Sequence, residues 1–184
     1  MLPLDSQYLE RFLGGEERAF EELVFRYQER LIYFIMRYVK DSTIAERLAQ
    51  EVFADLYRQK SGFLVDCTLR CYLFQFARKK AKKYLHRNRN HLQLAHSEHV
   101  IQDKSRLEQR LYPDGEKARL CKTISQFPKR LRTVAYLSEL EEMNEAEIAR
   151  IVRLPDCYVR YLLRQVECRL SKTMWYVRED LEEC

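Results

Sequence analysis

Residues 16–39, "EERAFEELVFRYQERLIYFIMRYV", decide the fold of this chain. Their apolar side chains recur every three or four positions, which is the spacing that one face of an α-helix requires. The face consists of Phe20, Leu23, Val24, Tyr27, Leu31, Phe34, Ile35 and Tyr38. Two glycines at 14 and 15 interrupt the pattern, and a shorter helix carrying Leu9, Phe12 and Leu13 is predicted before them. The spacing therefore predicts two helices separated by a break.

Composition extends the helical prediction to the whole chain. Its 184 residues include only four glycines and four prolines, fewer than strand-rich domains use in their turns. Hydrophobic residues make up 46% and charged residues 33%, so the chain can build a core. The six cysteines are scattered and form no C-x-x-C pair, which favours free thiols over a disulfide framework or a structural zinc. An all-α fold is predicted.

A helix from about 68 to 87 contains the most one-sided charge in the sequence. Residues 71–90, "CYLFQFARKKAKKYLHRNRN", hold seven Lys or Arg and no Asp or Glu. Cations crowded on one face repel each other, but they become favourable when a polyanion binds and releases its counterions. Aromatic side chains in the same stretch suit unstacked bases. Nucleic-acid contact is the favoured interpretation, and a solvated face over a core stripe is the alternative.

The C-terminal part predicts a second helical unit. Residues 91–116 are polar and contain Pro113 and Gly115, which indicates a linker with room for a short helical piece. Asn144 and Glu147 fit a capping box at the start of a short helix that ends near Val152. A tight turn and a helix from about 156 to 172 follow. The pattern is typical of a helix-turn-helix, and an ordinary helical hairpin is the alternative.

Other functional classes have little support in the sequence. A histidine cluster beside Asp103 suggests a metal-dependent nucleic-acid enzyme as a rival, but no H-E-x-x-H pattern fits it. The cluster consists of His86, His91, His96 and His99. We predict no metal, no cofactor and no catalytic residue. The start "MLPLDSQYLE" lacks the features of a signal peptide, and "LIYFIM" is too short to span a membrane. A cytoplasmic protein without membrane insertion is expected.

Four segments in order resemble bacterial RNA polymerase sigma factors of the extracytoplasmic-function (ECF) type, within the sigma-70 superfamily. The segments are "AFEELVFRYQERLIYFIMRYVKD", "AERLAQEVFADLY", "YLFQFARKKAKKYLHRNRN" and "ISQFPKRLRTVAYLSELEEMNEAEIARIVRLPDCYVRYLLRQVECRL". The second is similar to the family's Ala-Glu-Asp-Leu-x-Gln-Glu-Val-Phe signature. Each motif alone is weak, but their order and spacing cover nearly the whole chain.

The resemblance implies two small helical domains with different partners. Residues 1–90 would form a sigma-2-like domain that binds core polymerase and the −10 promoter element. Residues 91–116 would be the linker, and 117–184 would form a sigma-4-like helix-turn-helix domain that binds the −35 element. The implied function is an alternative sigma factor that directs promoter recognition, DNA melting and transcription initiation. The implied partners are core polymerase, through the coiled coil of its largest subunit, promoter DNA and an anti-sigma protein.

Residue roles follow from the resemblance position by position. The polymerase contact maps onto Gln50, Glu51 and Phe53, with Phe53 expected to be exposed unless it is simple core. The loop from 62 to 67 corresponds to the segment in which the family captures a flipped base. The −10 side maps onto Tyr72, Arg78, Lys79, Lys82, Lys83 and Arg87. The −35 side maps onto Tyr158, Arg160, Tyr161 and Arg164.

Five positions depart from the family pattern. Arg47, Lys79 and Lys83 stand where the family has Asp, Asn and Asp, so all three changes add positive charge. Tyr72 replaces a Trp and Cys157 replaces a Gly. The added charge strengthens the expectation of phosphate binding and weakens any inherited base preference. A helix-turn-helix regulator that acts as a dimer without core polymerase remains the second hypothesis, although it assigns no role to "AERLAQEVF".

Overall fold

The computed structural model describes residues 3–59, 68–88, 98–113 and 115–182, and within this part every regular element is helical. The predicted all-α fold is confirmed. The chain divides into two compact units, Met1–Leu111 and Tyr112–Cys184, which are described separately below. The first unit contains α1 (Pro3–Leu13), α2 (Glu17–Val39), α3 (Ser42–Arg58), α4 (Leu69–Arg87) and α5 (Glu98–Leu111).

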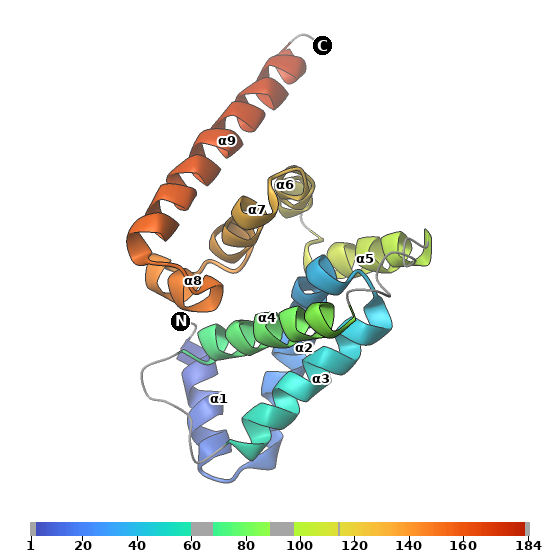
Figure 1. Cartoon of the computed structure of the whole chain (residues 1–184), viewed down its shortest axis with the longest axis vertical. Coiled ribbons are helices and arrows are strands. Elements are labelled where there is room, and N and C mark those ends of the chain that lie inside the picture. The colour runs from blue at the N-terminus through green and yellow to red at the C-terminus, as the bar shows by residue number, and fades with distance from the viewer. Residues whose placement is uncertain (1–2, 60–67, 89–97, 114, 183–184) are drawn as a thin grey trace. The chain divides into compact units, whose positions relative to one another are not determined.

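Helix α2 is the centre of the first unit, because α1, α3, α4 and α5 all pack against it (Figure 1). Its apolar face, predicted from the spacing of residues 16–39, is the face that is buried. Leu23, Leu31 and Ile35 on this face are fully enclosed. The Phe34 ring meets the Phe74 ring of α4 edge-on, with centroids 5.0 Å apart. This core fixes the side of α4 that turns away from solvent.

Side-chain caps fix where α3 and α4 begin. The Asp41 carboxylate caps α3 by accepting a hydrogen bond of 2.9 Å from the Ile44 amide. Thr68 caps α4 by accepting a 3.2 Å hydrogen bond from the Cys71 amide. Each cap satisfies an amide that the first helical turn leaves without a partner.

Helix α5 lies within the 91–116 segment that the sequence analysis interpreted as linker. It belongs to the first unit, where it packs on α2 and α3. Leu107 is buried, the Tyr33 hydroxyl donates a 3.2 Å hydrogen bond to Glu108, and Arg110 pairs with Glu29 at 3.1 Å. The helical piece is therefore longer and better anchored than its polar sequence suggested, because Leu107 is buried and both Glu108 and Arg110 bond to residues of α2.

The second unit is built from α6 (Gly115–Ser125), α7 (Lys129–Ala135), the π-helical turn η3 (Tyr136–Leu140), α8 (Glu145–Val152) and α9 (Asp156–Glu182). Tyr136 is fully buried and donates a 2.7 Å hydrogen bond to Glu141, which is also buried. Burial, followed by the Glu141 charge, raises the pKa of Tyr136 well above its usual value. The pair anchors the turn that leads into α8.

None of the described helices is long and apolar enough to cross a bilayer.

Candidate functional site

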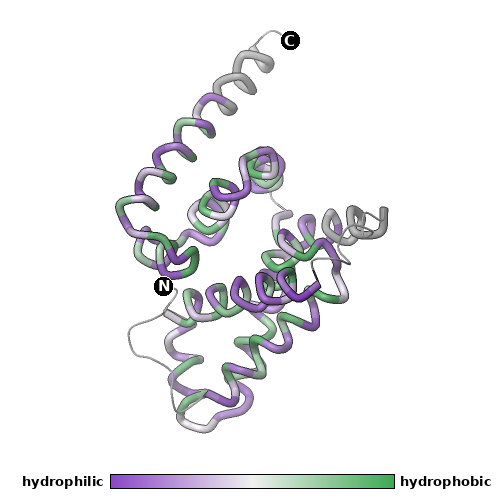
Figure 2. The backbone as a smooth tube through the Cα atoms, viewed as in Figure 1, coloured by the Kyte–Doolittle hydropathy of each residue, from purple (hydrophilic) through white to green (hydrophobic). Residues whose placement is uncertain are grey.

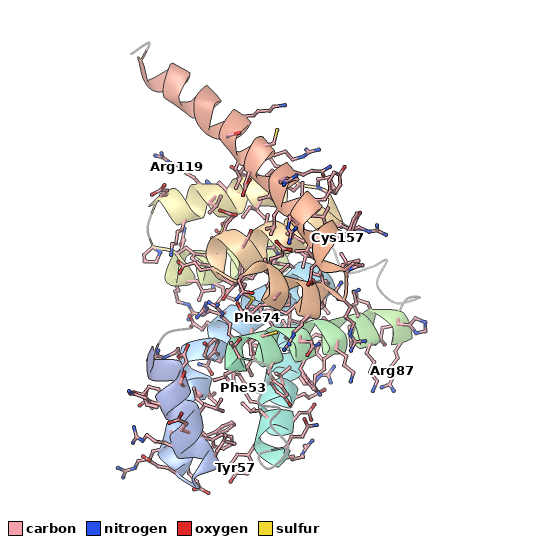
Figure 3. The ribbon with its side chains drawn as sticks, turned by 90° about the vertical axis from the view of Figure 1, so that its left-hand side faces the viewer. Phe53, Tyr57, Phe74, Arg87, Arg119 and Cys157 are labelled. Carbon is pink, nitrogen blue, oxygen red and sulfur yellow. The ribbon has the colours of Figure 1, made fainter. Side chains whose placement is uncertain are left out.

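Four exposed cations, Lys79, Lys82, Lys83 and Arg87, form what we call the α4 cationic face. Their spacing of one, three and four residues places them on one side of the helix, opposite the core residues Ala77 and Ala81. Arg78, also predicted here, is half-buried at the margin. In Figure 2 the C-terminal end of α4 is mostly hydrophilic, and in Figure 3 Arg87 lies at that end. Within the described residues, neither Lys83 nor Arg87 forms an ion pair with a carboxylate.

Lys80 sits in the same run of cations but has a different environment. Its ammonium lies 2.7 Å from an Asp55 carboxylate oxygen and 3.4 Å from Glu51, and its side chain is only 19% exposed. It joins α4 to α3 and is neutralised there. Lys80 is not among the residues that the resemblance assigned to DNA contact, and its tie to the acids of α3 joins two helices, so no local sequence pattern signals it.

Tyr72, which the resemblance assigned to DNA contact, is buried rather than open to solvent. Its hydroxyl donates a 2.9 Å hydrogen bond to Gln59, and its ring stacks on Phe76 with centroids 4.3 Å apart. Burial, and after it the charge of Asp55, raises the pKa of the Tyr72 phenol. Lys79 completes the row, with its ammonium 5.4 Å from the Phe76 centroid. Of the stacked pair, Tyr72 is buried, whereas Phe76 is partly exposed and lies beside Lys79 of the α4 cationic face.

The predicted polymerase residues on α3 separate into exposed and buried members. Gln50 is exposed, and Glu51 is half-exposed with a 2.8 Å hydrogen bond from Arg47. Phe53 is only 5% exposed and lies edge-on to Phe20, so the expectation of an exposed phenylalanine is wrong and this residue belongs to the core (Figure 3). The prediction failed because the side of α3 that carries Phe53 also packs against α2.

The helix-turn-helix of the second unit forms as its sequence predicted. The Asn144 side chain accepts from the Glu147 amide at 3.0 Å, and the Glu147 carboxylate accepts from the Asn144 amide at 3.1 Å, which completes the capping box. Arg153 ends α8 in the left-handed region with φ of 53°. Ile148 and Ile151 of α8 and Val159 of α9 are buried, and the two helices pack together.

The outer face of α9 presents the residues that the resemblance assigned to the −35 side. Tyr161 and Arg164 are exposed, and so is Cys157, a free thiol in the first turn of the helix (Figure 3). Tyr158 is half-buried and stacks with Tyr161 at a centroid distance of 6.0 Å. The Tyr161 hydroxyl accepts a 2.7 Å hydrogen bond from Gln165. A cation, aromatic rings and a thiol thus share one surface.

Arg160 is exposed but already bound within the chain. Its Nε and Nη2 atoms donate hydrogen bonds of 3.1 and 3.0 Å to the two carboxylate oxygens of Glu145, in the first turn of α8. This hydrogen bond is the main cause of the raised pKa of Arg160. The bridge crosses fifteen positions of sequence, and no local pattern signals it.

The remaining predicted features fall largely outside the described residues. The base-capture loop from 62 to 67 is one of these, as are His91, His96 and the side chains of His99 and Asp103. His86 is exposed at the end of α4. The described part of the chain holds no group of three or more residues that could ligate a metal.

Three comparisons with known proteins bear on this arrangement. The family model described as Sigma-70 region 2 matches residues 23–91. The chain is 31% identical over 180 residues to the RNA polymerase sigma-H factor of Pseudomonas aeruginosa, covering 92% of this chain and 93% of that one. It is 27% identical over 166 residues to the ECF RNA polymerase sigma-E factor of Escherichia coli, covering 85% and 86%.

The fold has a counterpart among solved structures as well. The structure of CnrH in complex with the cytosolic domain of CnrY matches with a TM-score of 0.61 and 19% identity, over 93% of this chain and 97% of that chain. Both helical units and their order are thus found in a solved fold. Given the match to Sigma-70 region 2 and the full-length similarity to sigma factors, this chain belongs to the sigma-70 family of RNA polymerase sigma factors, in its extracytoplasmic-function branch.

Proposed function

We propose that this chain is an alternative sigma factor that binds core RNA polymerase and directs promoter recognition and transcription initiation. The observation that carries the proposal is the α4 cationic face, which lies within the segment that matches Sigma-70 region 2. Four exposed cations on one helix side repel one another in the free protein and gain free energy when phosphates replace their counterions. The polymerase catalyses RNA synthesis in this proposal, and no reaction is assigned to the chain itself.

We assign the two units to different promoter elements. The α4 cationic face would hold the DNA backbone around the melted −10 element. The row formed by Tyr72, Phe76 and Lys79 supports this role, because Phe76 offers the partly exposed edge of a stacked pair beside a cation. The outer face of α9, with Tyr161 and Arg164, would meet the −35 element in the major groove. Two such contacts on one chain reinforce each other through effective concentration.

The exposed polar surface of α3 is proposed as the polymerase contact. Gln50 is its exposed centre, and Glu51 is oriented beside it by Arg47 and Lys80. We expect Gln50→Arg to abolish copurification of core polymerase with the chain, because a bulky cation would replace the amide at the contact. Gln28→Arg, on an exposed position of α2, is the matched control and should bind normally. Equal binding by wild type and Gln50→Arg would contradict the assignment of this surface.

A helix-turn-helix regulator that acts without polymerase is not favoured, because the similarity to sigma factors extends over both units. CnrH is found with the cytosolic domain of a second protein. We propose by analogy that this chain also has an inhibitory protein partner, as the ECF resemblance implies. Both the partner and the promoter would be met in the cytoplasm, where the DNA lies.

A further inference from the structure

Arg160 is an exposed cation on α9 whose guanidinium has a defined orientation. Both oxygens of Glu145 engage it, and the Glu145 side chain is 29% exposed while that of Arg160 is 61% exposed. Glu145 is itself well placed, because it follows the Asn144 cap and so occupies the first turn of α8. The buried contacts between α8 and α9 then fix the distance between the two residues.

Glu145 occupies one edge of the Arg160 guanidinium and leaves a second edge open. An arginine has five N–H donors, and the carboxylate takes the side edge formed by Nε and Nη2. The end edge, formed by Nη1 and the second hydrogen of Nη2, keeps two parallel donors. Two parallel donors are what the O6 and N7 acceptors of guanine require in the major groove.

We infer that Arg160 reads a guanine of the −35 element and that Glu145 is a positioning residue that presents the end edge of Arg160 to it. This inference rests on the proposed function. Glu145 lowers the entropic cost of reading, because the long arginine side chain is ordered before DNA arrives. It also disfavours a phosphate contact at this position, since the carboxylate partly neutralises Arg160 and repels the backbone. Within the described residues Arg164 has no carboxylate partner, so it is the natural backbone contact on the same surface.

The test is a selection from random double-stranded DNA by holoenzyme reconstituted from core polymerase and the full chain. Wild type should enrich a motif with a guanine column, and Arg160→Ala should flatten that column, with a loss of preference of roughly tenfold. Glu145→Gln should reduce the preference in the same column by about two- to fivefold, the range expected for an exposed ion pair. In an Arg160→Ala background, Glu145→Gln should have no further effect there.

Glu167→Gln is the matched control. Glu167 is an exposed carboxylate on α9 with no described partner, so its replacement removes the same charge without touching Arg160. Glu167→Gln should leave every column unchanged relative to the others, even if overall affinity rises. Thermal unfolding of all variants separates a loss of reading from a loss of folding.

Several results would overturn the inference. Flattening of all columns together by Glu145→Gln would mean that the pair only holds α8 to α9. No change in any column of the motif with Glu145→Gln would contradict the positioning role of Glu145. An unchanged guanine column with Arg160→Ala would contradict the base-reading role of Arg160. If Arg160→Ala weakened binding to all DNA sequences equally and reduced the salt slope of binding by about 0.9, Arg160 would be a phosphate contact. A wild-type holoenzyme that enriches no motif at all would instead contradict the proposed function.

Discussion

The α4 cationic face and Arg160 on α9 present positive charge in opposite ways. Lys83 and Arg87 project from α4 with no carboxylate partner among the described residues, whereas Arg160 is held on both donors of one edge by Glu145. Cations without a carboxylate partner suit the DNA backbone, because its phosphates need no exact alignment. A guanidinium that is fixed by a carboxylate suits the edge of a base, where the donors must be aligned. From this difference we propose that the first unit binds DNA mainly through charge and that the second adds sequence information.

The largest expected effect comes from reversing charge on the α4 cationic face. Lys82→Glu with Lys83→Glu should reduce open-complex formation by roughly 100-fold and lower the salt slope by about 1.8, which corresponds to two phosphate contacts. Reactivity of unpaired thymines to permanganate measures the opening, and copurification with core polymerase should be unchanged. Lys83→Glu alone should show a smaller defect, and Arg18→Glu, an exposed cation on α2, should show none. Normal promoter opening by the double variant would contradict the assignment of the α4 cationic face to DNA binding.

A second prediction separates two lysines three residues apart on α4. Lys80→Ala should lower the free energy of unfolding by about 1–2 kcal/mol, because it leaves the half-buried Asp55 carboxylate without its 2.7 Å partner. Lys83→Ala should leave stability unchanged and lower the salt slope of promoter binding by about 0.9. Urea denaturation and a salt titration measure the two quantities. The division between Lys80 as a structural residue and Lys83 as a DNA contact would be contradicted by the opposite result. In that result, Lys80→Ala would lower the salt slope and Lys83→Ala would lower the free energy of unfolding.

A third prediction concerns the start of the aromatic row. Tyr72→Phe removes the hydrogen bond to Gln59 but keeps the stack on Phe76, so the free energy of unfolding should fall by about 0.5–1.5 kcal/mol. Promoter opening at saturating protein should be retained, since the buried hydroxyl is not offered to DNA. A severe opening defect in a stable Tyr72→Phe protein would mean that this hydroxyl leaves the core to meet DNA.

The smallest effect is a change in alkaline sensitivity. The folded-state pKa of Tyr72 is raised, so its contribution to stability is complete below the usual tyrosine value near 10 and is lost as the pH rises through the folded value. Tyr72→Phe should therefore lose less stability than wild type between about pH 9 and 11. Unfolding by urea at several pH values measures the difference, and parallel curves for the two proteins would contradict the burial of this phenol.

Features that depend on local sequence could be predicted, and features that depend on tertiary neighbours could not. Asn144 and Glu147 encode their capping box within four residues, and the spacing of 16–39 encodes the face of α2. Phe53 was expected to be exposed and Tyr72 was assigned to DNA contact, yet both are buried, because a helical pattern identifies an apolar face but not how far a neighbouring helix covers it. The tie from Lys80 to Asp55 and the bridge from Arg160 to Glu145 each join different helices. Such pairs become visible only when the packing is known.

Run-off transcription tests the central claim most directly. Core polymerase would be supplied with the purified chain and with genomic DNA of the source organism, and the transcripts mapped. We predict discrete start sites that appear only with the chain present, share two upstream elements and disappear with Lys82→Glu and Lys83→Glu. Transcripts that are unchanged by adding the chain to core polymerase would contradict its assignment as a sigma factor that directs initiation.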